Sequence, residues 1–251
     1  MYVAVDGNLR DEKNKLSDAT TSWTHKIVTS GLFRNEVVLA LMTAISRTWL
    51  YPLQSTTFSP PDCEDIMKPL YSELLPKIGA NRKFPKVFHY APKTLIGLGL
   101  PNMYTMQGTA QIKALMDHVT KDTMVGKLIH TELELANMEL GVGLHLFDLD
   151  FSKWGHLLTD CWIKSLWQFC SDNGIELRGD YCKPTTQRHG DYFLMERLVE
   201  NYYDNFTKGE LQTINRCRIY LQFLTMADVS TGDGQRYTKK AFFWNPRQLQ
   251  N

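Results

Sequence analysis

The sequence predicts a mainly α-helical fold: a helical bundle with one short N-terminal strand and a smaller helical subdomain at the C-terminal end. Three observations lead to this prediction. Apolar residues recur at intervals of three and four through most of the 251 residues. Capping residues stand where several of these runs begin, and glycine or proline stands where they end. Strand-like patterns are confined to residues 1–5 and 175–177.

The N-terminal half begins with the predicted strand at residues 1–5. This strand ends in an Asp-Gly-Asn turn, and no strong candidate for a partner strand follows it in the sequence. We therefore expect its pairing strands to lie upstream of Met1. Helices are then predicted over residues 9–28, 37–49 and 63–75. Pro69 should kink the third of these helices.

Residues 82–101 contain several prolines and glycines and are predicted to be a loop or short extended segment. Asn102 can cap a following helix, and residues 125–140 form another that ends at Gly141. The stretch after it, residues 143–150, is interpreted as a linker. The predicted domains are therefore residues 1–142 and 151–251.

The C-terminal half contains three predicted helices. Asp160 can cap the first, which Gly174 stops. Asp191 opens the second after a polar loop, and Thr207 with Glu210 forms the capping box of the third.

Composition and charge exclude several classes of protein. Hydrophobic residues make up 43% and charged residues 22%, which is typical of a globular chain. With a net charge of +1, the whole molecule has no strong positive field, so any nucleic-acid site must be a local basic patch. No apolar run reaches the ~20 residues of a membrane span, and no signal-peptide pattern is present. Five cysteines without a C-x-x-C pair favour free thiols in a reducing compartment, so we expect an intracellular protein, cytoplasmic or nuclear.

The most suggestive candidate site is the basic segment between residues 82 and 93. Its cationic residues, with no acid among them, are Arg82, Lys83, Lys86 and Lys93. Its interleaved rings are Phe84, Phe88, His89 and Tyr90. Cations can meet phosphates and aromatic faces can stack on bases, which together indicate a nucleic-acid contact. The alternative is a solvated loop whose rings fold back into the core.

Two other clusters have weaker signals. His145, Asp148 and Asp150 have a spacing that could hold a divalent cation, whereas a linker with a capping carboxylate is the alternative. His189 and Asp191 could form an acid–base pair, but no nucleophile motif accompanies them and Asp191 can serve as a helix cap.

Arg216 and Arg218 lie on the helix that follows the capping box, where they could reach a phosphate. An exposed or ion-paired arginine is the common alternative on such a helix.

The order of several motifs resembles the region that follows the palm in non-LTR retrotransposon reverse transcriptases. Val3-Ala4-Val5-Asp6-Gly7 is similar to the "LGV…G" strand that closes the palm. Gly97-Leu98-Gly99-Leu100-Pro101-Asn102-Met103-Tyr104 resembles the "GGLGLPNLY" signature, with Ile96 in place of its first glycine. Residues 126–129, 162–169 and 214–218 resemble a C-terminal extension found in retroelement-derived reading frames of algae and other protists.

The resemblance implies a thumb-like region over residues 1–142 and a C-terminal helical extension over residues 151–251. Thumb helices of the family hold the template–primer duplex, and this role would map onto Arg82, Lys83, Lys86 and Lys93, with Tyr90 beside them. The palm aspartates of the "YxDD" type are absent, so no catalytic residue, metal or cofactor is expected. The implied partners are an RNA or DNA template–primer and a separate or upstream polymerase palm, and no membrane. An inert or protein-interaction helical domain is the alternative, and a small hydrolase or metal enzyme ranks third.

Overall fold

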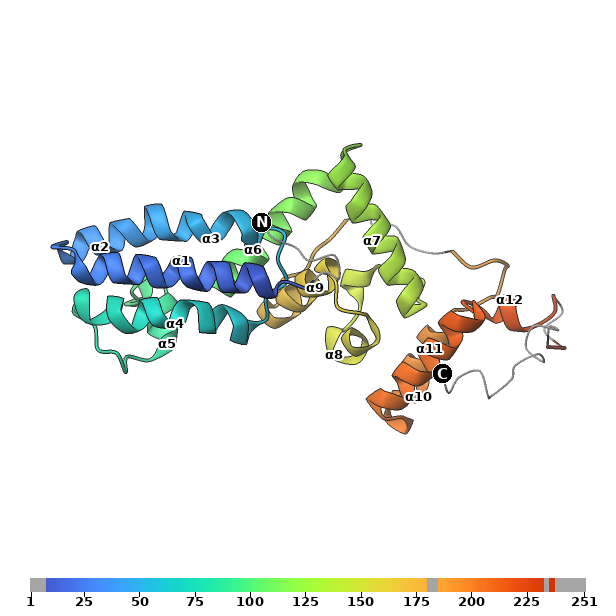
Figure 1. The fold of residues 1–251 in the computed structure, drawn as a ribbon. Coiled ribbons are helices and arrows are strands. Elements are labelled where there is room, and N and C mark those ends of the chain that lie inside the picture. Colours follow the sequence, from blue (N-terminus) through green and yellow to red (C-terminus); the bar gives the residue numbers. More distant parts are fainter. Residues whose placement is uncertain (1–7, 180–184, 233–234, 238–251) are drawn as a thin grey trace. The chain divides into compact units, whose positions relative to one another are not determined.

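A computed structural model describes residues 8–179, 185–232 and 235–237, and every regular element in these ranges is helical (Figure 1). The predicted mainly α-helical fold is confirmed. The strand predicted at residues 1–5 lies outside the described residues. Residues 175–177 are irregular, which corrects the second predicted strand: the amide of Ile175 donates to the carbonyl of Cys170 at 2.9 Å and so closes the preceding helix instead of pairing with a strand.

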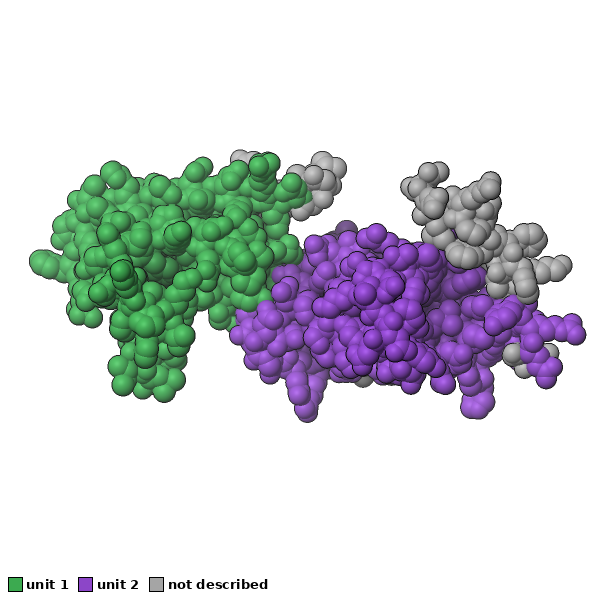
Figure 2. Space-filling model, turned by 90° about the horizontal axis from the view of Figure 1, so that it is seen from below, with its two compact units in different colours: residues 1–116 green, residues 117–251 purple. Residues whose placement is uncertain are grey.

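The chain divides into two compact units, residues 1–116 and residues 117–251 (Figure 2). This division falls before the helix Met124–Leu140, whereas the sequence-based boundary fell after it, at residues 143–150. The reason is that this helix, α7, packs on the later helices α9 (Trp162–Asn173) and α11 (Lys208–Leu221).

Unit 1 is a bundle of helices whose longest members run along one another. Its elements are α1 (Arg10–Thr29), α2 (Arg34–Ala40), the π-helical turn η1 (Leu41–Ile45), α3 (Ser46–Leu53), α4 (Pro60–Lys77), α5 (Lys86–Tyr90), the 3-10 turn η2 (Lys93–Leu95) and most of α6 (Met103–His118). Helix α1 packs along α4, and α2 contacts α4 as well (Figure 1). The α4 helix continues through Pro69, and a capping box at Ser59 starts it.

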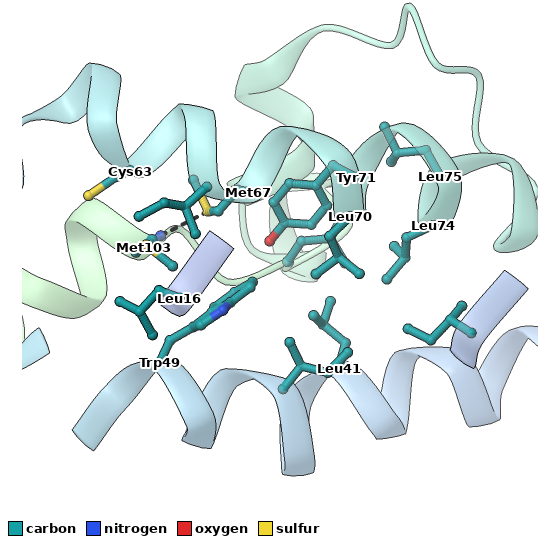
Figure 3. Packing of buried hydrophobic residues seen from close by; sticks show 14 of the residues in the cluster. Leu16, Leu41, Trp49, Cys63, Met67, Leu70, Tyr71, Leu74, Leu75 and Met103 are labelled. Atoms are coloured by element: carbon teal, nitrogen blue, oxygen red, sulfur yellow. Dashed lines mark hydrogen bonds between the residues drawn. The ribbon is translucent and has the colours of Figure 1, made fainter. Parts of the chain in front are cut away.

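The core of unit 1 surrounds the fully buried ring of Trp49 (Figure 3). Its indole Nε1 donates to Thr20 Oγ1 at 3.0 Å, and this hydroxyl donates to the carbonyl of Leu16 at 2.8 Å. The buried polar atoms are therefore paired inside the apolar cluster, as burial requires. The side chains packed around this centre include Leu16, Leu41, Met67, Leu70, Leu74 and Met103.

A buried glutamine ties α6 to the rest of unit 1. Gln107 accepts from the Thr56 hydroxyl at 3.1 Å and from the amide of Phe58 at 3.0 Å, and it donates to the carbonyl of Phe58 at 2.9 Å. The predicted cap of α6 is confirmed, because Asn102 Oδ1 accepts from the amide of Thr105 at 3.0 Å.

Unit 2 contains the remaining helices. They are α7, η3 (Leu146–Asp148), α8 (Phe151–Trp154), η4 (Gly155–Leu157), α9, α10 (Leu194–Tyr202), η5 (Tyr203–Asn205), α11 and α12 (Met226–Val229). Its core includes the fully buried side chains of Leu133, Leu140, Ile163, Leu166 and Leu211. Across the described residues, no helix is both long and apolar enough to cross a membrane.

The ends of the unit 2 helices follow the predicted signals with two exceptions. Gly141 and Gly174 end α7 and α9 at φ values of 69° and 63°, and Thr207 forms the predicted capping box with Glu210. Helix α9, however, is capped by Cys161 Sγ, while Asp160 forms an ion pair with Lys164 at 2.8 Å.

The second exception is the helix predicted to open at Asp191, which begins at Leu194. The Asp191 carboxylate instead accepts from the amides of Tyr192 and Ala227, each at 3.0 Å. It therefore joins two segments that are distant in the sequence.

Candidate nucleic-acid interface

The segment of residues 82–101, called here the basic loop, is a loop as its prolines and glycines predicted, but it is held in a compact, folded-back conformation. It contains the short helices α5 and η2, after which the chain folds back on α5. The amides of Leu98, Gly99 and Leu100 donate to the carbonyls of Phe88, Ala91 and His89 at 2.8, 2.9 and 2.9 Å. These long-range backbone bonds fix the loop, and sequence periodicity does not reveal them.

Three backbone positions within residues 96–99, where the chain folds back on α5, have special requirements. A Cβ atom on Gly97 would lie 1.9 Å from the carbonyl oxygen of Ala91, so only glycine fits there. Gly99 has a φ of +64° and Ile96 a φ of +62°, both left-handed. A β-branched side chain is strained in this region, and that of Ile96 is 86% exposed, so no burial offsets the strain. The conformation of Ile96 is one that glycine adopts freely.

Two of the four predicted cations are engaged by acids of α4. The Arg82 Nε donates to the carbonyl of Ser72 at 2.8 Å, and its Nη2 lies 3.2 Å from the carboxylate of Glu73. Lys86 Nζ lies 2.7 Å from the carboxylate of Glu64. All of these charged groups are largely exposed, so the pairs are weak and can exchange for another anion.

The other two cations, Lys83 and Lys93, are exposed. Within the part of the chain that the structure describes, neither forms an ion pair with an acidic side chain. The aliphatic stem of Lys93 lies beside Gly99, 3.5 Å from where a Cβ would stand. The loop thus presents two uncompensated positive charges and two that are shared with α4.

The rings of the loop pack mainly on one another. His89 is buried and stacks on Phe84, with ring centroids 6.0 Å apart and an interplanar angle of 19°. Tyr90 is half-buried and meets Tyr71 edge-on at 6.1 Å. Burial lowers the pKa of His89 and raises the pKa of Tyr90. Phe88, 41% exposed, is the ring of this group with the most open surface.

One carboxylate in each of the two other predicted clusters has a structural role. Asp150 Oδ1 accepts a hydrogen bond from the amide of Ser152 at 2.9 Å and caps α8. In the cluster of His145, Asp148 and Asp150, this is the capping carboxylate that was the alternative to a divalent-cation site. Among the described residues, no group of three or more histidine, cysteine or acidic side chains is placed to hold a metal ion. Asp191 binds backbone amides, as described above.

Arg218, interpreted from the sequence as exposed, ion-paired or reaching a phosphate, is instead buried at the ends of two helices. Its guanidinium donates to the carbonyls of Met138, Glu139 and Phe223 at 2.9, 2.6 and 3.1 Å and to Asn215 Oδ1 at 3.0 Å. It thereby satisfies two C-terminal carbonyls of α7 and the carbonyl of Phe223 in the segment that follows α11. Burial lowers its pKa to about 10, while the nearby Glu139 opposes this shift. Arg216, two residues earlier, is exposed.

Unit 2 also contains a groove that the sequence did not indicate. It has a volume of about 1270 Å³ and lies among α7, residues 156–160 and α11. Apolar side chains from α7 and α11, including Leu135, Met138, Ile219 and Tyr220, form much of its wall. The signal that could have revealed it is the second apolar face of α7, on the side opposite the core.

The chain was compared with known protein families, curated proteins and solved structures. No protein-family model, no curated protein and no solved structure matches the chain. The similarity to retroelement reverse transcriptases therefore rests on the sequence motifs alone.

Proposed function

We propose that unit 1 is a non-catalytic nucleic-acid-binding module, equivalent to the thumb of a retroelement reverse transcriptase, which contacts a template–primer duplex through the basic loop. The observation that carries the proposal is the set of exposed cations on a loop held by its own backbone hydrogen bonds. Lys83 and Lys93 are available for phosphates directly. Arg82 and Lys86 become available when a phosphate replaces Glu73 and Glu64, which costs little for exposed pairs.

The geometry of residues 96–99 is a second support. The signature that this segment resembles has glycine where Ile96 stands, and the backbone there adopts the left-handed conformation that glycine favours. The sequence resemblance and the backbone conformation are thus consistent with one another.

The contact proposed here is electrostatic and indifferent to base sequence. Phosphate contacts by lysine and arginine release counterions, so affinity falls steeply with salt. Four such contacts predict a loss of roughly 100-fold in affinity between about 50 and about 200 mM salt. Because His89 packs on Phe84 and Tyr90 packs on Tyr71 of α4, base stacking contributes little beyond what Phe88 can offer.

The experiment measures binding of the full chain to a fluorescently labelled RNA–DNA hybrid by anisotropy over a series of salt concentrations. The test variant reverses the charge of Arg82, Lys83, Lys86 and Lys93 together. The expected result is loss of binding and of its salt dependence.

A matched control keeps the overall charge of the test variant but moves the reversals elsewhere in unit 1. It replaces four exposed cations of the helices, namely Lys15, Lys26, Arg47 and Lys113, by glutamate. This control should bind far better than the loop variant. Equal binding by the two variants, or wild-type affinity in the loop variant, contradicts the proposal.

A protein-interaction role is the second candidate, and one specific observation favours it. Helix α7 exposes large apolar side chains along a face that does not contribute to the core of unit 2. Such a face is typical of a surface that another polypeptide covers.

A further inference from the structure

Helix α7 is apolar on two opposite sides. One side faces the core of unit 2 through buried residues such as Ile129, Leu133 and Leu140. The other side carries four large apolar side chains that are 58–73% exposed. These four are Met124, Leu128, Leu135 and Met138. Together with Thr131 they form a line along the helix, called here the α7 stripe (Figure 1 shows the helix).

The spacing of the α7 stripe is that of a helix–helix seam. Its members follow one another at intervals of four, three, four and three residues, which is the heptad spacing of knobs-into-holes packing. The middle member, Thr131, donates its hydroxyl to the carbonyl of Lys127 at 2.9 Å within the helix. It can therefore be buried in a seam without losing its hydrogen bond. The stripe fits another helix better than it fits a small molecule.

The charged residues that flank the α7 stripe indicate which helix packs on it. Lys127 and Glu134 lie on one flank, and Val125, Glu132 and Glu139 lie on the other. We propose that α7 pairs with α7 of a second copy of this chain, antiparallel, with the twofold axis between residues 129 and 130. Each Lys127 then faces Glu134 of the second copy, once on either side of the axis.

The same register places the apolar side chains in complementary layers. Leu128 packs on Thr131 of the second copy, and Met124 packs on Leu135 of the second copy. The twofold axis repeats both layers, so one patch pairs with itself, as an isologous interface requires. Within the single chain, Lys127 forms an ion pair with Asp122 at 2.9 Å. Both side chains are largely exposed, so replacing Asp122 by Glu134 of the second copy costs little.

Other arrangements of two α7 helices bring like charges together. Sliding the antiparallel pair to the next seam register places Glu134 opposite Glu134 and Glu132 opposite Glu132. A parallel pair in register places Glu134 beside Glu139 of the second copy and Lys127 beside Glu132, so the repulsive contact offsets the attractive one. Like charges along a seam oppose pairing, so the flanking residues select the antiparallel register centred between residues 129 and 130.

The test is sedimentation velocity of the full chain from about 1 to about 100 µM, the range in which an interface of modest size associates. We expect a reversible monomer–dimer equilibrium. Leu128→Glu should abolish the dimer, whereas Leu39→Glu, at a similarly exposed leucine of α2, should leave it unchanged.

Charge reversal tests the register itself. Lys127→Glu and Glu134→Lys each replace two attractive contacts by repulsive ones and should weaken the dimer roughly ten-fold. The double variant K127E/E134K restores both contacts and should dimerise within about three-fold of wild type. These exposed substitutions leave the core intact, so the test remains decisive even if Leu128→Glu disturbs folding.

Three outcomes overturn the proposal. They are a chain that stays monomeric over the whole concentration range, a dimer that is insensitive to Leu128→Glu in a folded protein, and a double variant as weak as its parents. The first would indicate that the α7 stripe is covered by something other than a second copy. These three outcomes do not test the basic loop. The proposed dimer and the proposed nucleic-acid role are therefore tested independently.

Discussion

The buried guanidinium of Arg218 should be among the largest single contributors to the stability of unit 2. Arg218→Met keeps an unbranched apolar stem in the same space but removes the hydrogen bonds to three backbone carbonyls and to Asn215. Hydrogen bonds to a charged group contribute about 1.5–3 kcal/mol each. The lowered pKa of Arg218 indicates an opposing cost of about 3 kcal/mol for burying the charge. Four such hydrogen bonds at the lower end of this range contribute about 6 kcal/mol, so subtracting the cost leaves a net destabilisation of at least about 3 kcal/mol.

The assay is urea denaturation combined with native-state hydrogen exchange of peptides from α7 and α11, because the guanidinium of Arg218 in α11 binds C-terminal carbonyls of α7. Arg216→Met on the exposed side of α11 is the matched control and should change stability by less than ~0.5 kcal/mol. The exchange rates should rise at the C-terminal end of α7 in Arg218→Met only. A stability loss below about 1 kcal/mol would refute the reasoning, because the carbonyls would then be satisfied without the guanidinium.

Two further predictions concern unit 1. Ile96→Gly should stabilise the chain by about 0.5–1 kcal/mol in thermal or urea unfolding, because it relieves a left-handed β-branched residue with almost no loss of burial. Leu95→Gly, one residue earlier and without a positive φ, should instead destabilise it, and the reasoning fails if the two variants shift in the same direction. Burial holds the pKa of His89 below its ordinary value of 6.5, so the unfolded state binds the proton more readily. The stability that neutral His89 provides is full above pH 6.5 and is lost as the pH falls through the folded-state pKa. His89→Gln should therefore flatten the acid side of the stability curve, and His25→Gln, at an exposed histidine, should not.

Much of the helical framework could be predicted from local sequence patterns. The caps at Asn102 and Thr207 and the stops at Gly141 and Gly174 depend on residues within one turn of the helix end. The apolar spacing of α4 likewise reports directly on the side that is buried. These features need no knowledge of distant segments, and the structure confirms them.

The candidate site was only partly predictable. The sequence identifies the cations between residues 82 and 93 but not the acids that meet them, because Glu64 and Glu73 come from α4. It also identifies the rings but not their packing on one another or on Tyr71. Which charges stay free for a ligand is therefore decided by side chains outside the segment.

The sequence by itself determined the helical class of the protein, the main helix boundaries and the position of the basic loop. Only the tertiary structure decided that Arg218 is buried, that α7 belongs with the second unit, and that a second apolar face of α7 remains exposed. The physical reason is that periodicity records that a face is apolar, whereas burial depends on what packs against it. A helix with two apolar faces and an arginine at a helix end both look ordinary until their neighbours are known.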